Sequence, residues 1–324
     1  MFKYPSISQF RDVVHNVEYD NRKESIDFIR TTKIHGSNCS IILDLQNNKL
    51  STQSRNTVIT TEDDFMGFAK FVQSQATEII ETMSYYLISR EGLKTVSKPT
   101  HLIFYGEWCG KGIQKGTAIN NLKKMFIVFD ACLVVDDELI FDTNFHVNGK
   151  NILSPNVDIY SISNIDSNKV TLDFRNPKSL QKSLFEDVLK AENECPVGKW
   201  FGVTGTGEGY VYTSVCGNYK FKAKGDKHSV SNSKVRTPEE LEHLKDVAKF
   251  VQSVLLEPRL EQGIEYLKEM KLPIDSISTG AYIKWVNQDV LKEEGDLIAE
   301  LGLDKNTVNK EISRLAREYF KKVL

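Results

Sequence analysis

One stretch of seven residues, Thr32-Lys33-Ile34-His35-Gly36-Ser37-Asn38, has residue types suited to covalent chemistry. Lys33 ends an apolar run, and a histidine and a glycine follow it two and three residues later. Such a lysine is expected where a strand exits into a turn, with its amine directed into the cleft that the turn encloses. An exposed lysine before a hairpin is the ordinary alternative, so support must come from residues elsewhere in the chain.

A second lysine pair lies near residue 223. A lysine titrates near ~10.4, and its ammonium form is not a nucleophile, so a reactive lysine needs burial or neighbouring cations that disfavour that form. Lys222 and Lys224 alternate along an expected strand, which places both side chains on one face. Facing Lys33, they are expected to lower its pKa and to bind phosphate. The alternative is a solvated edge strand whose lysines discourage aggregation.

Two glutamates and one phenylalanine complete the candidate set. Glu107 and Glu208 each stand where an apolar strand meets glycine-rich backbone, where a carboxylate can bind ribose hydroxyls or hydrated magnesium. Phe129 can stack on a purine, although most strand phenylalanines belong to the core. Arg55 can pair with phosphate or with an acidic neighbour.

The elements expected to position these side chains are mostly hairpins. Residues 39–45 and 50–54 form one predicted hairpin, turning at Gln46-Asn47-Asn48, which returns Arg55 to the side of the lysine. Apolar residues at steps of three and four predict one amphipathic helix over 62–89. Strands over 101–105 and 125–130 follow, then a hairpin over 133–141, a helix near 180–191, and a hairpin over 210–215 and 219–223.

The remaining residues indicate a second, helical domain. Thr237, Pro238 and the two glutamates after them are a strong helix start. Amphipathic helices are predicted over 241–256, 260–270, 277–293 and 307–323, and the polar stretch 229–236 is the expected boundary. The prediction is an α+β domain of antiparallel sheets with flanking helices over residues 1–232, followed by a small all-α domain over 237–324.

Composition limits the class of protein. The 324 residues, 40% hydrophobic and 27% charged, fit two globular domains. A net charge of -2 gives no global basic excess, but a local basic groove can coexist with an acidic exterior. No apolar run approaches the ~20 residues that span a bilayer, and the N-terminus lacks a signal peptide. Five scattered cysteines without a C-x-x-C pair favour a reducing cytoplasm over disulfides or zinc.

Taken in order, the candidate residues form a series of motifs. They are K-x-H-G-x-N from Lys33, then Arg55, F-x-G-E ending at Glu107, V-F-D ending at Asp130, E-G-Y-V from Glu208, and F-K-x-K ending at Lys224. The series closely resembles the RNA ligase 2 family of phage and kinetoplastid RNA-editing ligases, related to DNA ligases and mRNA capping enzymes. His35 and the stretch Gly112-Ile-Gln-Lys115 favour this branch over DNA ligases.

The resemblance implies a nucleotidyltransferase fold followed by a helical domain, and it implies a role for each motif residue. Lys33 would carry AMP on its side-chain nitrogen, and Glu208 would support the catalytic metal. Nucleotide contacts are implied for Thr32 and Ile34 (adenosine, through their backbone), His35 and Asn38 (phosphate), Arg55 and Glu107 (ribose and phosphate), Phe129 (adenine), and Lys222 and Lys224 (phosphate).

There are two departures from the family pattern. Tyr212 replaces the usual aliphatic residue, and Val211–Ser214 lacks a lysine that relatives often have. These departures bear on substrate contacts more than on nucleotide chemistry.

The function implied is an ATP-dependent, Mg²⁺-requiring RNA ligase that joins 3′-OH and 5′-phosphate ends at nicks in duplex RNA. It is expected to act as a cytoplasmic monomer without membrane association. A capping-type guanylyltransferase or a DNA ligase is the nearest alternative, but either would call for an OB-fold of short strands after residue 236. A catalytically inactive RNA-binding module is the non-enzyme alternative. Such a module would tolerate loss of the nucleophile, yet Lys33, Glu107, Glu208 and Lys222 are all present.

Overall fold

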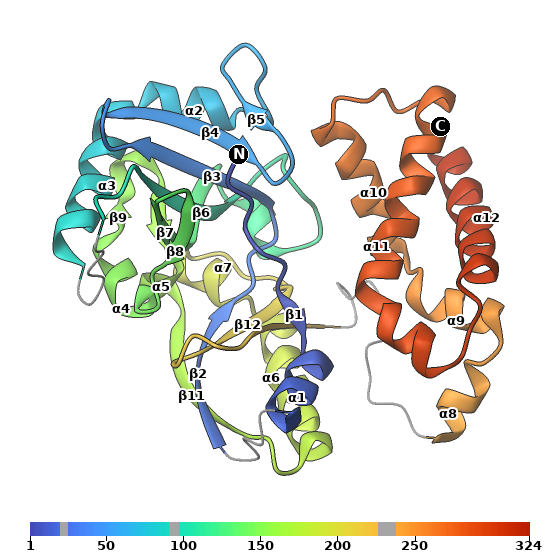
Figure 1. The fold of residues 1–324 in the computed structure, drawn as a ribbon. Coiled ribbons are helices and arrows are strands. Elements are labelled where there is room, and N and C mark those ends of the chain that lie inside the picture. The colour runs from blue at the N-terminus through green and yellow to red at the C-terminus, as the bar shows by residue number, and fades with distance from the viewer. Residues whose placement is uncertain (20–24, 91–96, 226–237) are drawn as a thin grey trace. The chain divides into compact units, whose positions relative to one another are not determined.

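The computed structural model describes residues 1–19, 25–90, 97–225 and 238–324. The chain divides into two compact units, Met1–Gly225 and Asp226–Leu324, which Figure 1 shows with their elements labelled. The boundary predicted over 229–236 lies outside the described residues. No described helix is both long and apolar enough to cross a bilayer.

The first unit contains two sheets, whose strands pair mainly antiparallel. The exceptions are β1 with β13 and β10 with β7, which pair parallel. The five-stranded sheet has the order β1 (Ser8–Gln9), β13 (Lys220–Lys224), β12 (Gly209–Ser214), β2 (Ser25–Thr32), β11 (Ser167–Asp173). The eight-stranded sheet has the order β5 (Val58–Ile59), β4 (Lys49–Ser54), β3 (Ser37–Asp44), β6 (His101–Cys109), β7 (Met125–Val135), β10 (Ile159–Ser161), β9 (Leu153–Ser154), with β8 (Glu138–Phe141) pairing β7.

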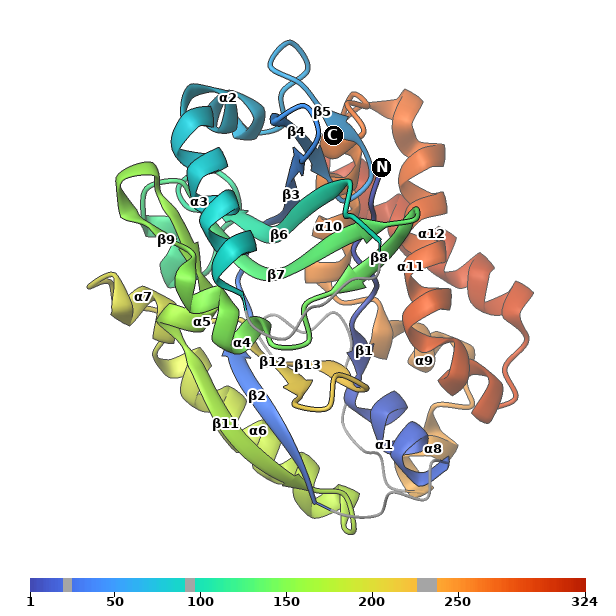
Figure 2. The ribbon, with the colours of Figure 1, turned by 60° about the vertical axis from the view of Figure 1, so that its left-hand side comes forward.

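Helices cover each sheet and close two separate cores. On the five-stranded sheet, α1 (Phe10–Tyr19) and α6 (Pro177–Asn193) bury residues such as Phe28 and Phe221. On the eight-stranded sheet, α2 (Phe68–Ser74) and α3 (Ala76–Ser89) cover a larger core (Figure 2). Short helices connect the strands: α4 (Phe145–Asn148), α5 (Ile162–Ile165), α7 (Pro196–Trp200), and the 3₁₀ turns at Ala118–Asn121, Gly149–Asn151 and Pro155–Val157. The α+β class predicted from sequence is confirmed.

The predicted hairpins are confirmed, but the helix predicted over 62–89 is wrong in its bounds. The helical segment begins at Phe68 because the Asp64 carboxylate accepts the backbone N–H groups of Ala69 (2.8 Å) and Lys70 (3.2 Å). It is also interrupted at Gln75, whose φ of -129° is not helical. The acidic residues therefore precede the helix, and Asp64 caps it from outside.

The second unit is helical throughout its described residues: α8 (Pro238–His243), α9 (Val247–Val254), α10 (Glu257–Glu269), α11 (Thr279–Glu300) and α12 (Lys305–Val323), with a 3₁₀ turn at Ser276–Ser278. The single helix predicted over 241–256 is wrong, because Asp246 caps a new helix by accepting the N–H of Lys249 at 3.0 Å. The buried guanidinium of Arg259 lies 3.1 Å from Asp289 and 3.3 Å from Glu294, so α10 is tied to α11 by paired charges.

Candidate active site

The lysine motif is the crossing between the two sheets of the first unit. Strand β2 ends at Thr32 in one sheet and β3 begins at Ser37 in the other, so residues 33–36 make the passage. The Lys33 N–H donates to the carbonyl of Gly209 at 2.9 Å, which fixes the start of the crossing. A Cβ on Gly36 would clash with the Trp108 carbonyl oxygen and lie 2.9 Å from Cγ of Glu107. Glycine is therefore required for the chain to pass this close to β6.

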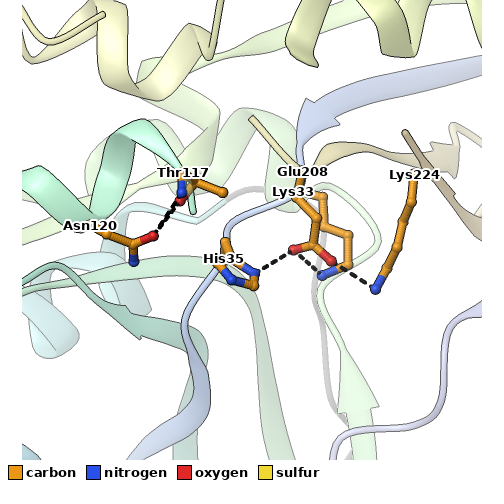
Figure 3. A network of polar contacts seen from close by, with 6 residues as sticks. All are labelled: Lys33, His35, Thr117, Asn120, Glu208 and Lys224. Atoms are coloured by element: carbon orange, nitrogen blue, oxygen red, sulfur yellow. Dashed lines mark hydrogen bonds and ion pairs between the residues drawn. The ribbon is translucent and has the colours of Figure 1, made fainter. Parts of the chain in front are cut away.

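A buried carboxylate gathers the cationic side chains at this crossing. Glu208, which precedes β12, is 4% exposed. Its Oε2 lies 2.9 Å from Lys33 Nζ and 3.3 Å from His35 Nδ1, and its Oε1 lies 2.7 Å from Lys224 Nζ (Figure 3). Burial raises the pKa of Glu208, but the charges of Lys224 and Lys33 outweigh it and hold that pKa well below its usual range. Glu208 is thus an ionised centre shared by both lysines.

The pKa values of the two lysines move in opposite directions. Burial lowers the pKa of Lys33, but the carboxylates of Glu208 and Glu107 outweigh it, so the net direction is upward. The expectation that neighbouring lysines leave Lys33 with a lowered pKa is therefore wrong for this conformation, because its nearest charges are carboxylates. Burial, followed by the charges of Lys33 and Lys222, instead lowers the pKa of Lys224 to about 8, although Glu208 opposes the shift.

A polar row on the eight-stranded sheet lies beside the crossing. Asn38 on β3 pairs directly with Glu107 on β6, so both side chains are on one face. Ser54 pairs with Cys39 at the end of β4, and the charge of Arg55, the next residue, acts on Lys33 and Glu107. Burial raises the pKa of Glu107 to about 7, while the charges of Lys33, His35 and Arg55 oppose that shift. The hairpin thus returns Arg55 to the lysine, as predicted.

Phe129 is positioned by a β-bulge. Tyr105 pairs with Asp130 and Gly106 with Val128, which leaves Phe129 as an extra residue of β7. Bulges of this kind redirect a side chain and are common beside active sites. The ring of Phe129 remains partly exposed and meets the edge of Tyr4, 5.1 Å between centroids.

Next to Phe129 is a polar junction that the sequence analysis missed. Tyr4 donates to Asp130 Oδ2 at 2.7 Å, and Lys220 Nζ lies 2.8 Å from the same oxygen and also donates to the Tyr4 hydroxyl. Lys220 belongs to one sheet and Asp130 to the other, so the N-terminal segment fastens the sheets together. Sequence signals existed for two of the three residues, because Lys220 continues the alternation of Lys222 and Lys224, and Asp130 follows Phe129.

Three other predicted residues occupy backbone or strand positions. Thr32 is 2% exposed and its hydroxyl donates to Asp166 at 2.5 Å, while Ile34 is buried in the core of the eight-stranded sheet. Both side chains are therefore occupied inside the protein, and the backbone contacts with adenosine stay a prediction. Lys222 lies between Lys220 and Lys224 on the same face of β13, and its charge contributes to the lowered pKa of Lys224.

Tyr212, the departure from the family pattern, is a core residue. It is fully buried and stacks on Phe221, with 4.8 Å between ring centroids and an interplanar angle of 6°. Its ring therefore packs on the core face of β12, on the side of the sheet covered by α1 and α6. The substitution changes how the core is filled.

This arrangement can bind an anion and a cation side by side. Lysine and arginine charges can hold phosphate, while two adjacent carboxylates supply the oxygen donors that magnesium prefers. Among the described residues, no group of three or more histidine, cysteine and acidic side chains forms a metal cage. A metal ion at this site would therefore take further ligands from water and substrate, which is usual for magnesium.

One family model and several solved structures are similar to this chain. A family model described as RNA ligase matches residues 26–228, which hold all the motif residues above. The solved structures similar to this chain include two Naegleria gruberi RNA ligase variants. The variant with AMP and Mn is 15% identical, with a TM-score of 0.47, over 70% of this chain and 56% of that chain. The variant with ATP and Mn is 14% identical, with a TM-score of 0.48, over 70% and 57%.

The present chain thus spans slightly more than half the length of these structures. No match was found among curated proteins. The family model covers more than half of the chain, including the strands of both sheets apart from β1 and the first residue of β2. The chain therefore belongs to the RNA ligase family.

Proposed function

We propose that the chain is an ATP-dependent RNA ligase that seals 3′-OH and 5′-phosphate ends at nicks in duplex RNA. The observation that supports this most directly is the position of Lys33, at the crossing of the sheets and 2.9 Å from a buried carboxylate that also binds Lys224. Membership of the RNA ligase family supports the same substrate class.

The proposed reaction begins with Lys33 as nucleophile. Its neutral Nζ attacks the α-phosphorus of ATP, an N–P bond forms, the bond to the bridging oxygen breaks, and pyrophosphate leaves. Glu107, with its pKa raised to about 7, is suited to accept the proton that Lys33 loses. Lys224 and Arg55 supply positive charge for the phosphates.

Two further transfers would complete the joining of the ends. An oxygen of the RNA 5′-phosphate attacks the Lys33-bound phosphorus, so that the N–P bond breaks and AMP moves to the RNA as a phosphoanhydride. The 3′-hydroxyl then attacks the RNA phosphate, a phosphodiester bond forms, and AMP leaves. Phe129, which is partly exposed at the bulge of β7, would stack on adenine throughout.

Magnesium fits Glu208, whose carboxylate is held ionised, and leaves Glu107 to accept the proton. Both are carboxylates near Lys33, as the effect of each on its pKa requires. When bound there, Mg²⁺ would neutralise phosphate charge and compete with the Lys33 ammonium for Glu208. The two carboxylates raise the pKa of Lys33, and an ion held at Glu208 would offset that effect and favour the neutral amine.

Mass spectrometry after incubation of the full chain with ATP or with GTP tests the proposal. A mass increase of one AMP that is absent in Lys33→Ala supports it. Lys169→Ala serves as the control and should retain the adduct. It removes an exposed lysine of β11 that pairs with Asp27 of β2. A GMP adduct favours the capping alternative, no adduct favours an inactive RNA-binding module, and an undiminished adduct in Lys33→Ala refutes the assigned nucleophile.

A further inference from the structure

Charge is unevenly distributed over the helical unit. Helices α9, α10 and α11 together carry nine acidic and five basic residues. Helix α12 reverses this balance, with six basic residues and two acidic ones. In a chain with a net charge of -2, this helix is therefore a local concentration of positive charge.

Four of these basic residues form a row along one face of α12. Lys310, Arg314, Arg317 and Lys321 follow one another at steps of four, three and four, the spacing of neighbours on a helix surface, and all four are exposed. The helix packs on the unit's core through a different set of positions. The buried positions are Val308, Ile312, Ala316 and Phe320.

The row is not explained by the stability of the helix. Like charges at these spacings repel one another and destabilise a helix. Attraction to the helix dipole accounts for Lys321 in the last turn but not for Lys310, which lies in the second turn, beyond the reach of that effect. Glu311 and Glu318 pair with Arg314 at 2.6 and 2.7 Å, so Lys310, Arg317 and Lys321 provide most of the net charge.

We propose that this row is a binding surface for the phosphate backbone of RNA. The inference rests on the proposed function, since it assigns part of the RNA contact to the helical unit. From Lys310 to Lys321 the row extends roughly 17 Å, at about 1.5 Å per residue, which is long enough to follow several phosphates of one strand. Contacts of this kind carry no base preference and weaken as salt rises.

The chain offers a matched pair of variants. Arg317→Gln with Lys321→Gln removes two charges from the row. Lys305→Gln with Lys322→Gln removes two charges from the same helix, at exposed positions outside the row. Both double variants change the net charge equally, and their helix content is checked by circular dichroism.

Binding of each full-length protein to a fluorescein-labelled nicked RNA duplex is measured from about 50 to 200 mM salt. We expect the row variant to reduce the slope of log K against log salt by roughly 1.4 to 1.8, because each lost phosphate contact removes about 0.7 to 0.9. The control should keep the wild-type slope, and the charge-preserving variant Arg317→Lys should do so too. An unchanged slope in the row variant, or an equal loss in the control, overturns the proposal.

Two further measurements separate this proposal from its alternatives. The AMP adduct should form equally in all variants, because the row is outside the first unit. A wild-type chain without an adduct would refute the ligase proposal while leaving the binding result interpretable.

The alternative occupant of the row is a second copy of the chain. An acidic row on α10 could pair with α12 of that copy; its residues are Glu257, Glu261, Glu265 and Glu269. Self-association of the wild type in sedimentation, abolished in the row variant while RNA binding is unchanged, would overturn the proposal in favour of that contact.

Discussion

Replacing Lys224 by methionine should stabilise the protein while removing its activity. Lys224 is 13% exposed and its ammonium is held between Glu208 and the charges of Lys33 and Lys222. Burial, together with those two lysines, lowers its pKa from 10.5 to about 8. Methionine keeps much of the side-chain volume and has no charge to bury, and Glu208 retains Lys33 and His35 as partners.

The size of the stabilisation follows from the pKa of Lys224 in the unfolded and in the folded chain. The folded pKa lies below the unfolded one, so folding disfavours the protonated form, and this cost is fully present below pH 8. It declines as pH rises from 8 toward 10.5, because there the unfolded chain holds a proton that the folded chain has lost. The difference between 10.5 and about 8 corresponds to on the order of 3 kcal/mol near pH 7, and to on the order of 1 kcal/mol near pH 9.5.

Hydrogen exchange of the full chain, read by mass spectrometry at β12 and β13, measures the stability of the first unit separately from that of the helical unit. We expect Lys224→Met to increase protection near pH 7, with the gain shrinking toward pH 9.5, and to lose the AMP adduct. Lys169→Met, at an exposed lysine of β11 that does not act on the pKa of Lys224, is the control for lysine replacement. A variant less protected than wild type near pH 7, or a gain that does not depend on pH, would refute the reasoning.

Three other outcomes are expected. Gly36→Ala should slow adduct formation on the order of a hundredfold, because its Cβ meets the Trp108 carbonyl and displaces Lys33 and His35; an adduct rate equal to wild type would show that the crossing can shift freely. Tyr4→Phe should reduce the free energy of unfolding by about 1–2 kcal/mol through loss of the hydroxyl shared with Asp130 and Lys220, measured by urea titration against wild type. A chain truncated after residue 236 should still form the adduct but seal RNA poorly, and equal sealing by both chains would show that the helical unit is dispensable.

Local sequence determined the short-range structure. The hairpin over residues 39–54 turns at Asn47-Asn48, and the one over 133–141 turns at Asp136 and Asp137, which both adopt positive φ. Asparagine and aspartate tolerate this conformation better than most residues, so the turns could be predicted. The alternation of β13 likewise predicted that Lys222 and Lys224 share a face. Helix bounds were less predictable, because capping by Asp64 and Asp246 competes with apolar periodicity.

Motif order indicated the family before any contact was known. It named Lys33, Glu107 and Glu208 as members of one site, although the latter two lie 74 and 175 residues beyond the lysine. The residue types also limited the chemistry, since a lysine with carboxylates and further cations suits phosphoryl transfer. The sequence could not indicate which charge is nearest to which.

Only the tertiary structure decided the electrostatics of the site. The pairing of β2 with β12 brings Lys33 to Glu208, and the sheet crossing brings Lys33 to Glu107. These two carboxylates raise the pKa of Lys33, whereas the lysine-rich motif alone predicts that it falls. The Tyr4–Lys220 contact joins residues 216 positions apart. Charge interactions depend on distance and burial, and both are set here by strand pairings between remote segments that no local pattern encodes.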